Sequence, residues 1–551
     1  MLLRKTLLAL AVGGLLLQAA DAAPPAPRLV ERDGRHALLV DGAPFLILGA
    51  QAHNSSNHPN ALKKVWPAVA DAKANTLLMP VSWEQVEPEE GRFDFSFVDT
   101  LVKEARQRQV RLVLLWFATW KNTNPQYTPG WVKFDNQRFP RMVDREGKLH
   151  YVLSPHGEAT LAADKRAFTA LMAHLKKIDQ AQRTVIMVQV QNEVGSYGLV
   201  RDFGPAAQAA FERPVPAEVL ARKKSPVPGA PASGHWKAVY GDYADEYFHA
   251  WATARYIGEI AKAGRAVYDL PMFVNNALRD PLEQPVAPWK GNFAAGGPTH
   301  DVIDIYKAAA PAIDIVGPDI YNPKADAVSA VLAQFQRPDN ALWVPEIGNA
   351  EGYARYLYQI IGRGAIGVSP FGLDYTAYSN FVLGNRFTDQ RMVEPFAKVY
   401  RAFRPLQRQW AEWALQGRTH GVAEGDDHAD QVVALKGWKA HVSFGQWQFG
   451  EKDWPENAKN PPPHANQLLG GVAIAQTGDD EFLVIGQYAR VRFEPEPVPG
   501  KQGAMLARVE EGGFDDRGRW AVERTWNGDQ VDWGLNLTAT PITLKVRLGR
   551  Y

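Results

Sequence analysis

Short apolar runs alternate with longer amphipathic stretches through most of the chain. Eight runs have the length of β-strands and are flanked by Asn, Asp, Pro or Gly, as in βα units. They are residues 45–50, 76–81, 111–117, 184–191, 272–276, 314–321, 342–345 and 365–369. Between them, apolar residues at spacings of three and four predict helices, among them 61–74, 97–108, 165–177, 245–267, 325–335 and 352–361. Eight strand-like runs that alternate with helix-like runs favour an α/β fold, and within it a closed (β/α)8 TIM barrel. An open doubly wound sheet is the alternative, and no Gly-rich phosphate loop supports it.

The pattern changes in the last quarter of the chain. Residues 393–413 predict one more helix, so we place the barrel domain at 28–414, with a short β-hairpin at 28–41 leading into it. Residues 415–551 contain short alternating runs separated by Gly, Asp and Pro, at 431–435, 440–444, 481–485, 504–509, 520–526 and 542–546. This pattern predicts a smaller C-terminal β-sandwich-like domain. A Pro-rich loop is expected inside it at 451–466.

Residues 1–22 have the features of a secretory signal peptide. Arg4 and Lys5 precede an apolar stretch at 7–17 that is too short to span a bilayer, and Ala20-Asp-Ala22 resembles a cleavage site. An uncleaved anchor is the alternative. We therefore expect an exported protein, periplasmic or secreted, with no membrane span in the mature chain. A net charge of +1 gives no reason to expect a nucleic-acid partner, and the lack of cysteine excludes disulfides and thiolate chemistry.

Two glutamates end apolar runs on the fourth and seventh predicted strands. These are Glu193, which follows 184–192, and Glu346, which follows 341–345. Residues at the carboxyl ends of barrel strands point into one pocket, and cleavage of a glycosidic bond requires two carboxyl groups. Glu193 would protonate the glycosidic oxygen, while the amide of Asn192 binds the hydroxyl group at C2. Glu346 would attack the anomeric carbon, and the phenol of Tyr321 would keep it ionised.

The distance between the two carboxyl groups would distinguish two mechanisms. A separation of about 5–5.5 Å indicates retention of configuration, and about 6.5–9.5 Å indicates inversion. A single strand-end glutamate is more often a helix-cap partner or a member of a surface ion pair, so the prediction depends on the two together. Amide and aromatic side chains near the strand ends are the candidates for substrate binding, namely Asn192, Asn54, Trp83, Trp120, Asn122, Trp236 and Tyr321. We expect no cofactor and no metal, since His53 alone is not a metal site.

Four motifs carry a resemblance to a known group of enzymes. They are 77–95, which includes Glu-Pro-Glu-Glu-Gly-Arg-Phe-Asp-Phe, 114–122, 188–198 with Gln-Asn-Glu, and 343–346 with Trp-Val-Pro-Glu. The chain resembles glycoside hydrolases of clan A, and most closely the family 35 β-galactosidases of a bacterial subgroup with an additional C-terminal β-domain. The turn at 87–95 occurs in families such as 35 and 42. The resemblance implies a retaining exo-β-galactosidase with Glu193 as acid/base and Glu346 as nucleophile.

One departure from the family pattern leaves the identity of the hydrolysed sugar undecided. Many family 35 members have Cys-Ala-Glu at the third strand end, where the Glu binds galactose, and this chain has Phe117-Ala118-Thr119. Our leading hypothesis is hydrolysis of terminal β-D-galactosyl residues from oligosaccharides, with plant cell walls as the expected source. The insertion at 201–240 is expected to narrow the pocket, which would favour single terminal sugars. The alternatives are a clan A enzyme for arabinosides or fucosides, and a non-catalytic carbohydrate-binding protein.

Overall fold

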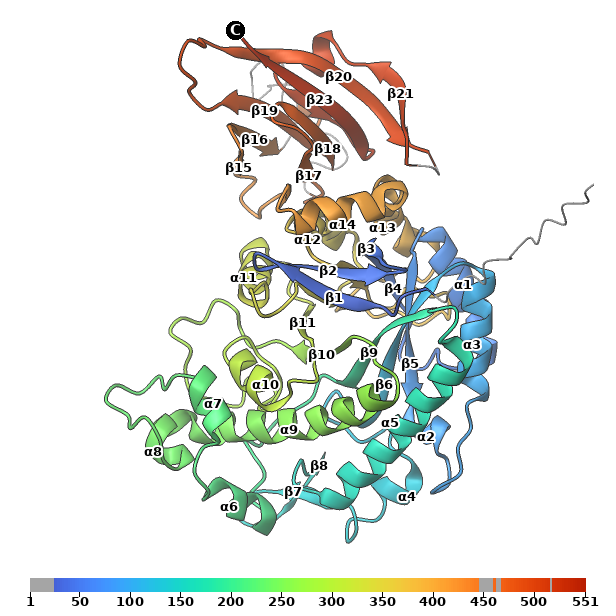
Figure 1. Cartoon of the computed structure of the whole chain (residues 1–551), viewed down its shortest axis with the longest axis vertical. Helices are drawn as coiled ribbons and strands as arrows, with labels where there is room; N and C mark the ends of the chain where they lie inside the picture. The colour runs from blue at the N-terminus through green and yellow to red at the C-terminus, as the bar shows by residue number, and fades with distance from the viewer. Residues whose placement is uncertain (1–23, 445–458, 462–466, 516–517) are drawn as a thin grey trace, which may run out of the picture.

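A closed parallel barrel forms the centre of the molecule (Figure 1). The computed structural model describes residues 24–444, 459–461, 467–515 and 518–551, so the predicted signal at 1–22 lies outside it, as does the predicted loop at 451–466 except for 459–461. Within the described part, eight strands close the barrel in the order β10-β11-β12-β13-β4-β5-β6-β9. Their bounds are β4 (Ile47–Gln51), β5 (Thr76–Ser82), β6 (Arg111–Lys121), β9 (Val185–Asn192), β10 (Met272–Ala277), β11 (Ile315–Ile320), β12 (Trp343–Ile347) and β13 (Gly367–Pro370). The predicted (β/α)8 fold is confirmed.

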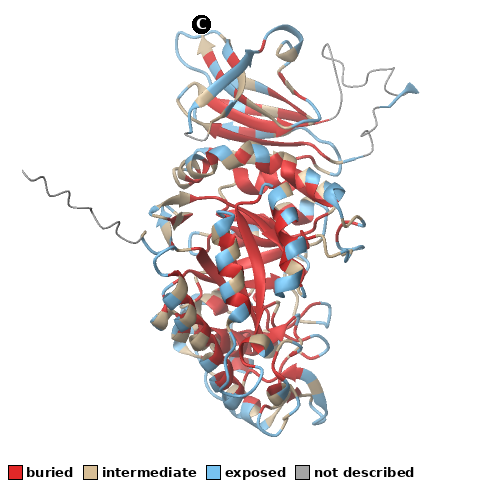
Figure 2. Ribbon diagram, turned by 90° about the vertical axis from the view of Figure 1, so that its right-hand side faces the viewer, coloured by how far each residue is buried: buried red, intermediate tan, exposed pale blue. Residues whose placement is uncertain are grey.

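The strands read as continuous apolar runs because both of their faces are covered. All seven residues of β5 and all eight of β9 are buried. Figure 2 shows the buried strands in the middle of the molecule and exposed residues on the outer faces of the surrounding helices. A parallel sheet covered by helices needs apolar residues on both faces, which removes the alternation that an antiparallel sheet would show.

Helices surround the barrel between consecutive strands. The longer ones are α1 (Pro59–Asp71), α3 (Ser96–Gln107), α5 (Glu158–Asp179), α9 (Ala244–Val267), α11 (Ala325–Phe335) and α13 (Gln390–Phe403), and the shorter ones include α2 (Trp83–Val86), α4 (Gly130–Lys133), α10 (Ile303–Ala309) and α12 (Tyr356–Gly362). The insertion at 201–240 holds three more, α6 (Pro205–Phe211), α7 (Ala217–Arg222) and α8 (Trp236–Tyr240). Among the described residues, no helix combines the length and the apolar character needed to cross a bilayer.

The helix predicted at 393–413 is wrong as a single element. The structure has two helices there, α13 and α14 (Gln407–Leu415), separated by a 3-10 turn at Arg404–Leu406. Pro405 explains the break, because it has no N–H for the helical hydrogen bond and its ring clashes with the preceding turn. The predicted N-terminal hairpin is present as β1 (Arg28–Arg32) and β2 (Arg35–Val40), and β3 (Ala43–Phe45) extends it to three strands.

The C-terminal domain is a sandwich of two antiparallel sheets. One sheet has the order β14-β17-β18-β23-β20-β21, and the other has the order β15-β16-β19-β22. Their bounds are β14 (Thr419–Ala423), β15 (Gln431–Leu435), β16 (Trp438–Phe444), β17 (Gly471–Gln476), β18 (Glu481–Gln487), β19 (Ala489–Pro495), β20 (Ala504–Phe514), β21 (Trp520–Thr525), β22 (Leu535–Leu537) and β23 (Ile542–Arg550). A separate apolar cluster that includes Trp438 and Phe482 fills the space between them, so the predicted β-sandwich is confirmed. A small hairpin, β7 (Arg141–Val143) and β8 (Leu149–Leu153), belongs to the barrel domain.

The barrel domain meets the sandwich through close backbone contact between α12 and β14. A Cβ atom at Gly362 would lie 2.3 Å from the carbonyl oxygen of His420, and one at Gly421 would lie 2.2 Å from the carbonyl oxygen of Tyr358. The buried guanidinium group of Arg355 adds a bond across the junction, since its Nε donates to the carbonyl oxygen of Glu424 at 3.0 Å. Glycine at these positions is therefore what allows the two domains to share a tightly packed interface.

Replacing Gly362 with alanine should destabilise this junction. The added methyl group has no space and forces the backbone of β14 away, which costs about 1–3 kcal/mol. The expected result is a lower melting temperature in thermal unfolding. Gly513→Ala on β20 is the matched control, because a Cβ there meets nothing within 4 Å. Equal melting temperatures for Gly362→Ala and the wild type would contradict the packing described here.

Candidate active site

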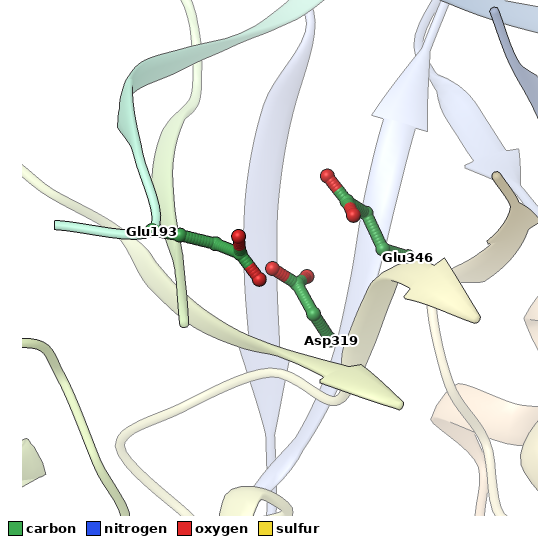
Figure 3. Close-up of side chains that lie close together, drawn as sticks. All are labelled: Glu193, Asp319 and Glu346. Carbon is green, nitrogen blue, oxygen red and sulfur yellow. The ribbon is translucent and has the colours of Figure 1, made fainter. Parts of the chain in front are cut away.

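Three carboxyl groups meet at the carboxyl ends of the barrel strands (Figure 3). Glu346 lies on β12, Asp319 lies beside it on β11 as its register partner, and Glu193 directly follows β9. One carboxylate oxygen from each residue lies within 4.8 Å of the others. The structure therefore brings the two glutamates predicted from the sequence into one cluster and adds an aspartate.

Glu346 is surrounded by hydrogen-bond donors. The phenol of Tyr321 donates to its Oε2 at 2.8 Å, and the amide of Gln51 donates to its Oε1 at 2.9 Å. Asn275 Nδ2 lies 3.4 Å from the same Oε1. Burial, together with the charge of Glu346, raises the pKa of Tyr321 well above its usual range, so this phenol stays protonated and donates. These donors orient the side chain and stabilise a negative charge on it.

Glu193 has the opposite environment. Burial of its carboxyl group, followed by the charge of Glu346, raises the pKa of Glu193 to about 7, although the charge of Lys121 lowers it in part. The carboxyl groups of Glu193 and Asp319 face each other, with an oxygen of each within 4.8 Å of the other (Figure 3). Two neighbouring glutamates are thus set apart, one stabilised as an anion and the other able to hold a proton near neutral pH.

Amide side chains link the strand ends into one network. Asn192 Nδ2 donates to Asn122 Oδ1 at 3.0 Å, and Asn192 Oδ1 accepts from Gln189 at 2.9 Å and from Asn275 at 3.1 Å. The ammonium group of Lys121 also donates to Asn122 Oδ1. Of the predicted site residues, Asn192, Asn122 and Tyr321 therefore lie with the two glutamates.

The backbone around Glu193 adopts conformations that favour glycine. Gln191 and Glu193 have φ angles of 65° and 42°, and the neighbouring Asn122 and Thr123 have 50° and 64°. Two backbone hydrogen bonds, both 3.1 Å long, join these strand ends, Asn122 N–H to Asn192 and Thr123 N–H to Glu193. Left-handed non-glycine residues cost of order 1–3 kcal/mol each and concentrate at functional sites. Because four such residues lie at the ends of β6 and β9, the backbone there is strained, as is common at functional sites.

The structure does not support the three predicted tryptophan contacts. Trp83, Trp120 and Trp236 are at most 1% exposed. Trp83 packs edge-on against Trp131, Trp120 packs against Tyr256, and Trp236 packs against Phe248, Trp251 and Tyr240. An indole enclosed in this way has no face open to a sugar ring. These residues belong to the core, since residue type alone does not show which side of a strand end or helix a ring occupies.

Exposed tyrosines near the strand ends offer aromatic faces instead. Tyr197 is 45% exposed, and partial burial of its phenol, followed by the charge of Glu193, raises its pKa. Tyr378 is 62% exposed and packs edge-on against His53, two residues after Gln51. The predicted Asn54 is partly exposed, and its buried Oδ1 has no hydrogen-bond partner among the described residues. The side-chain oxygen of Asn54 can therefore still accept a hydrogen bond, but Asn54 does not contact Glu346 directly.

Sequence reasoning did not select Asp319, Asn275 and Gln51. Each is a polar residue in a barrel strand, on β11, β10 and β4, and each makes a hydrogen bond inside the pocket. The available signal was their position at a strand end. That signal is weak, because many polar residues lie at or near the ends of the barrel strands and only the fold shows which ones face each other.

Two family models match parts of the chain. Residues 60–268 match the model of glycoside hydrolase family 42, described as beta-galactosidase, and residues 396–538 match a domain of unknown function, DUF5597. No curated protein matches. The matched barrel segment, which contains Glu193, and the paired carboxyl groups define an enzyme of the glycoside hydrolase class. The resemblance to clan A is thereby supported, whereas the matching family is 42 and not the expected 35. The turn at 87–95 is shared by both families and could not separate them.

Three solved glycosidases are similar to this chain at low sequence identity. A β-galactosidase from psychrophilic Marinomonas ef1 is 11% identical with a TM-score of 0.46, over 67% of this chain and 61% of that one. A β-galactosidase from Bacillus circulans sp. alkalophilus is 11% identical with a TM-score of 0.49, over 91% and 99%. Endo-glycoceramidase II from Rhodococcus sp. is 12% identical with a TM-score of 0.41, over 95% and 99%. The chain thus spans 61% of the length of the Marinomonas structure.

The protonation of Glu193 should appear in the pH dependence of stability. Its folded-state pKa of about 7 lies above the ordinary value of 4.5, so the folded state binds the proton more tightly than the unfolded state. The free energy of unfolding should therefore fall, through this group, as pH rises from about 4.5 to about 7. Glu193→Gln removes this contribution. The variant should gain stability relative to the wild type as pH rises across that window in urea unfolding. A difference that does not change with pH would show that Glu193 is not the group that holds the proton.

Proposed function

We propose that the protein is a retaining exo-acting β-galactosidase that hydrolyses terminal β-D-galactosyl residues of oligosaccharides. The observation that supports this most directly is the pair of glutamates. One carboxylate oxygen of each lies within 4.8 Å of the other, a short approach that favours retention over inversion. Their opposite surroundings supply one anion and one acid. The match of residues 60–268 to a model described as beta-galactosidase favours galactose as the sugar.

In the first step, Glu346 attacks the anomeric carbon while Glu193 gives its proton to the glycosidic oxygen. The bond between Glu346 and the sugar forms as the glycosidic bond breaks, and the aglycone leaves with the proton. Tyr321 and Gln51 hold Glu346 in position for this attack. The amide of Asn192, fixed by Gln189 and Asn275, binds the hydroxyl group at C2, where interaction strengthens in the transition state.

In the second step, the roles of the glutamates reverse. Glu193, now a carboxylate, takes a proton from water, and the water oxygen attacks the anomeric carbon from the side that the aglycone left. The bond to Glu346 breaks and the sugar leaves with its original configuration. Both steps need Glu193 to exchange a proton near neutral pH, which its pKa of about 7 allows.

The exo mode rests on the walls around the pocket. Immediately after Glu193, the backbone of Ser196 pairs with Ala295 through hydrogen bonds of 2.8 and 2.9 Å. This bridge joins the segments that follow β9 and β10, and the insertion with α6, α7 and α8 continues from it. A joined wall on this side favours a closed pocket that admits one terminal sugar. We further propose that the enzyme acts after export, on fragments of plant cell-wall polysaccharide.

A panel of nitrophenyl glycosides tests the choice of sugar. We expect the β-galactoside to give the highest kcat/KM, with the released galactose first detected by proton NMR as the β anomer. A higher kcat/KM for the α-arabinoside or the β-fucoside would change the assigned sugar but not the proposed mechanism. First release of the α anomer would contradict retention. Binding of galactose without turnover of any glycoside would favour a carbohydrate-binding protein.

Glu346→Gln should lower kcat by several orders of magnitude, because the covalent step disappears while the fold remains. Glu351→Gln, an exposed glutamate on the turn Glu351–Arg355 five residues later, is the matched control and should keep wild-type kcat. Rates measured on the best substrate of the panel, with melting temperatures alongside, separate loss of chemistry from loss of fold. Wild-type kcat in Glu346→Gln would rule out this nucleophile.

A further inference from the structure

Asp319 is a buried carboxyl group that the two-step mechanism does not use. It is 3% exposed and pairs in register with Glu346. Figure 3 shows its carboxyl group between the two glutamates, with one edge toward Glu193. A third carboxylate in this space would add negative charge where Glu346 already carries it, so its protonation state affects the whole site.

The hydrogen bonds of Asn275 show which oxygen of Asp319 is free. Asn275 Oδ1 accepts the backbone N–H of Glu193 at 2.9 Å, and this contact fixes the orientation of the amide. Its Nδ2 then faces Asp319 and donates to Oδ2 at 2.7 Å. Oδ2 is therefore an acceptor, while Oδ1 is buried with no donor among the described residues. The neighbour that remains for Oδ1 is the carboxyl group of Glu193, which faces Asp319 in Figure 3, with an oxygen of each residue within 4.8 Å of the other.

A hydrogen bond between two carboxyl groups requires a proton on one of them, since an ionised carboxylate only accepts. A bound cation could also join carboxylates. Here the donors already present in the cluster, Tyr321, Gln51 and Asn275, point at its oxygens. Their arrangement fits one anion and protonated neighbours better than three anions around a metal ion. Burial, with the charges of Glu346 and Glu193, raises the pKa of Asp319 well above its usual range, which agrees with a neutral acid.

We propose that Asp319 is a positioning residue that stays protonated at Oδ1 and donates a hydrogen bond to Glu193 through both steps of catalysis. The inference rests on the proposed function and deepens it. The Asp319 O–H bond never breaks. When Glu193 loses its proton to the aglycone, the carboxylate that forms is stabilised by this donor. When water gives a proton back to Glu193, the same bond holds the carboxyl group in place.

Two substitutions distinguish a neutral donor from an ionised aspartate. Asp319→Asn keeps an N–H donor toward Glu193 and an acceptor toward Asn275, so kcat should stay within about tenfold of wild type. Asp319→Ala removes the donor, and kcat/KM, which reports the first step alone, should fall by about 10- to 100-fold on an alkyl β-galactoside, whose leaving group needs a proton. The loss should be much smaller on dinitrophenyl β-galactoside. The pKa on the alkaline side of the kcat/KM profile should shift to higher pH in Asp319→Ala only, because the carboxylate of Glu193 loses a hydrogen-bond donor there.

Three outcomes would overturn the assignment. Equal losses in both variants would mean that an ionised Asp319 is needed. A loss in Asp319→Ala that is the same for both leaving groups would mean a structural role. Wild-type rates in both variants would mean that Asp319 does not position Glu193.

Infrared spectroscopy tests the same claim without activity. At about pH 8, well above the ordinary pKa of aspartate, the difference spectrum between the wild type and Asp319→Asn should show the C=O band of one protonated carboxyl group, because subtraction removes the contribution of Glu246, whose pKa burial raises to about 8. Asp164→Asn is the matched control, because Asp164 is also buried but has a pKa of about 6 and should be ionised there. If the wild type hydrolyses no glycoside, the proposed function fails, and this band still decides the protonation of Asp319. Absence of the band would refute the inference even in an active enzyme.

Discussion

Repulsion between carboxyl groups in one buried space is the constraint on which this site depends. Glu193, Asp319 and Glu346 cannot all be anions within 4.8 Å of one another without a large electrostatic cost. Tyr321 and Gln51 donate to Glu346, so the negative charge is best accommodated there. The protons are then held by the other two groups. Acid and nucleophile are assigned by their surroundings, although both are glutamates.

The barrel strands hold the three carboxyl groups in place, although the backbone near Glu193 is strained. The strands are buried on both faces and give rigid positions to Glu346, Asp319 and Asn275. Where β6 and β9 end, the backbone adopts left-handed conformations at four non-glycine residues, including Glu193 itself. The sandwich domain packs against α12 through the glycine contacts of Gly362 and Gly421 (Figure 1). The core and the domain junction thus stabilise the fold, and the left-handed residues around Glu193 destabilise it locally.

Most of the fold follows from the sequence because its signals are local. Eight apolar runs predicted eight barrel strands, and alternating runs predicted the sandwich. The helix break at Pro405 was local too, but the apolar spacing on either side concealed it. The strand-end rule selected Glu193, Glu346, Asn192, Asn122 and Tyr321, which do lie together. It failed for Trp83, Trp120 and Trp236, because burial depends on packing partners distant in sequence. The contacts of Asp319 with Asn275 and Glu193 could not be predicted either, since they join the ends of β9, β10 and β11.

The central claim is that Glu346 forms a covalent bond to the sugar while Glu193 handles the proton. An activated β-galactoside with fluorine at C2 slows both steps and lets the intermediate accumulate. Mass spectrometry of the treated protein should show one added fluorosugar, and peptide mapping should place it on Glu346. The label should be absent from Glu346→Gln. A label on Glu193 or Asp319, or turnover of the parent galactoside with no labelled protein, would contradict the account.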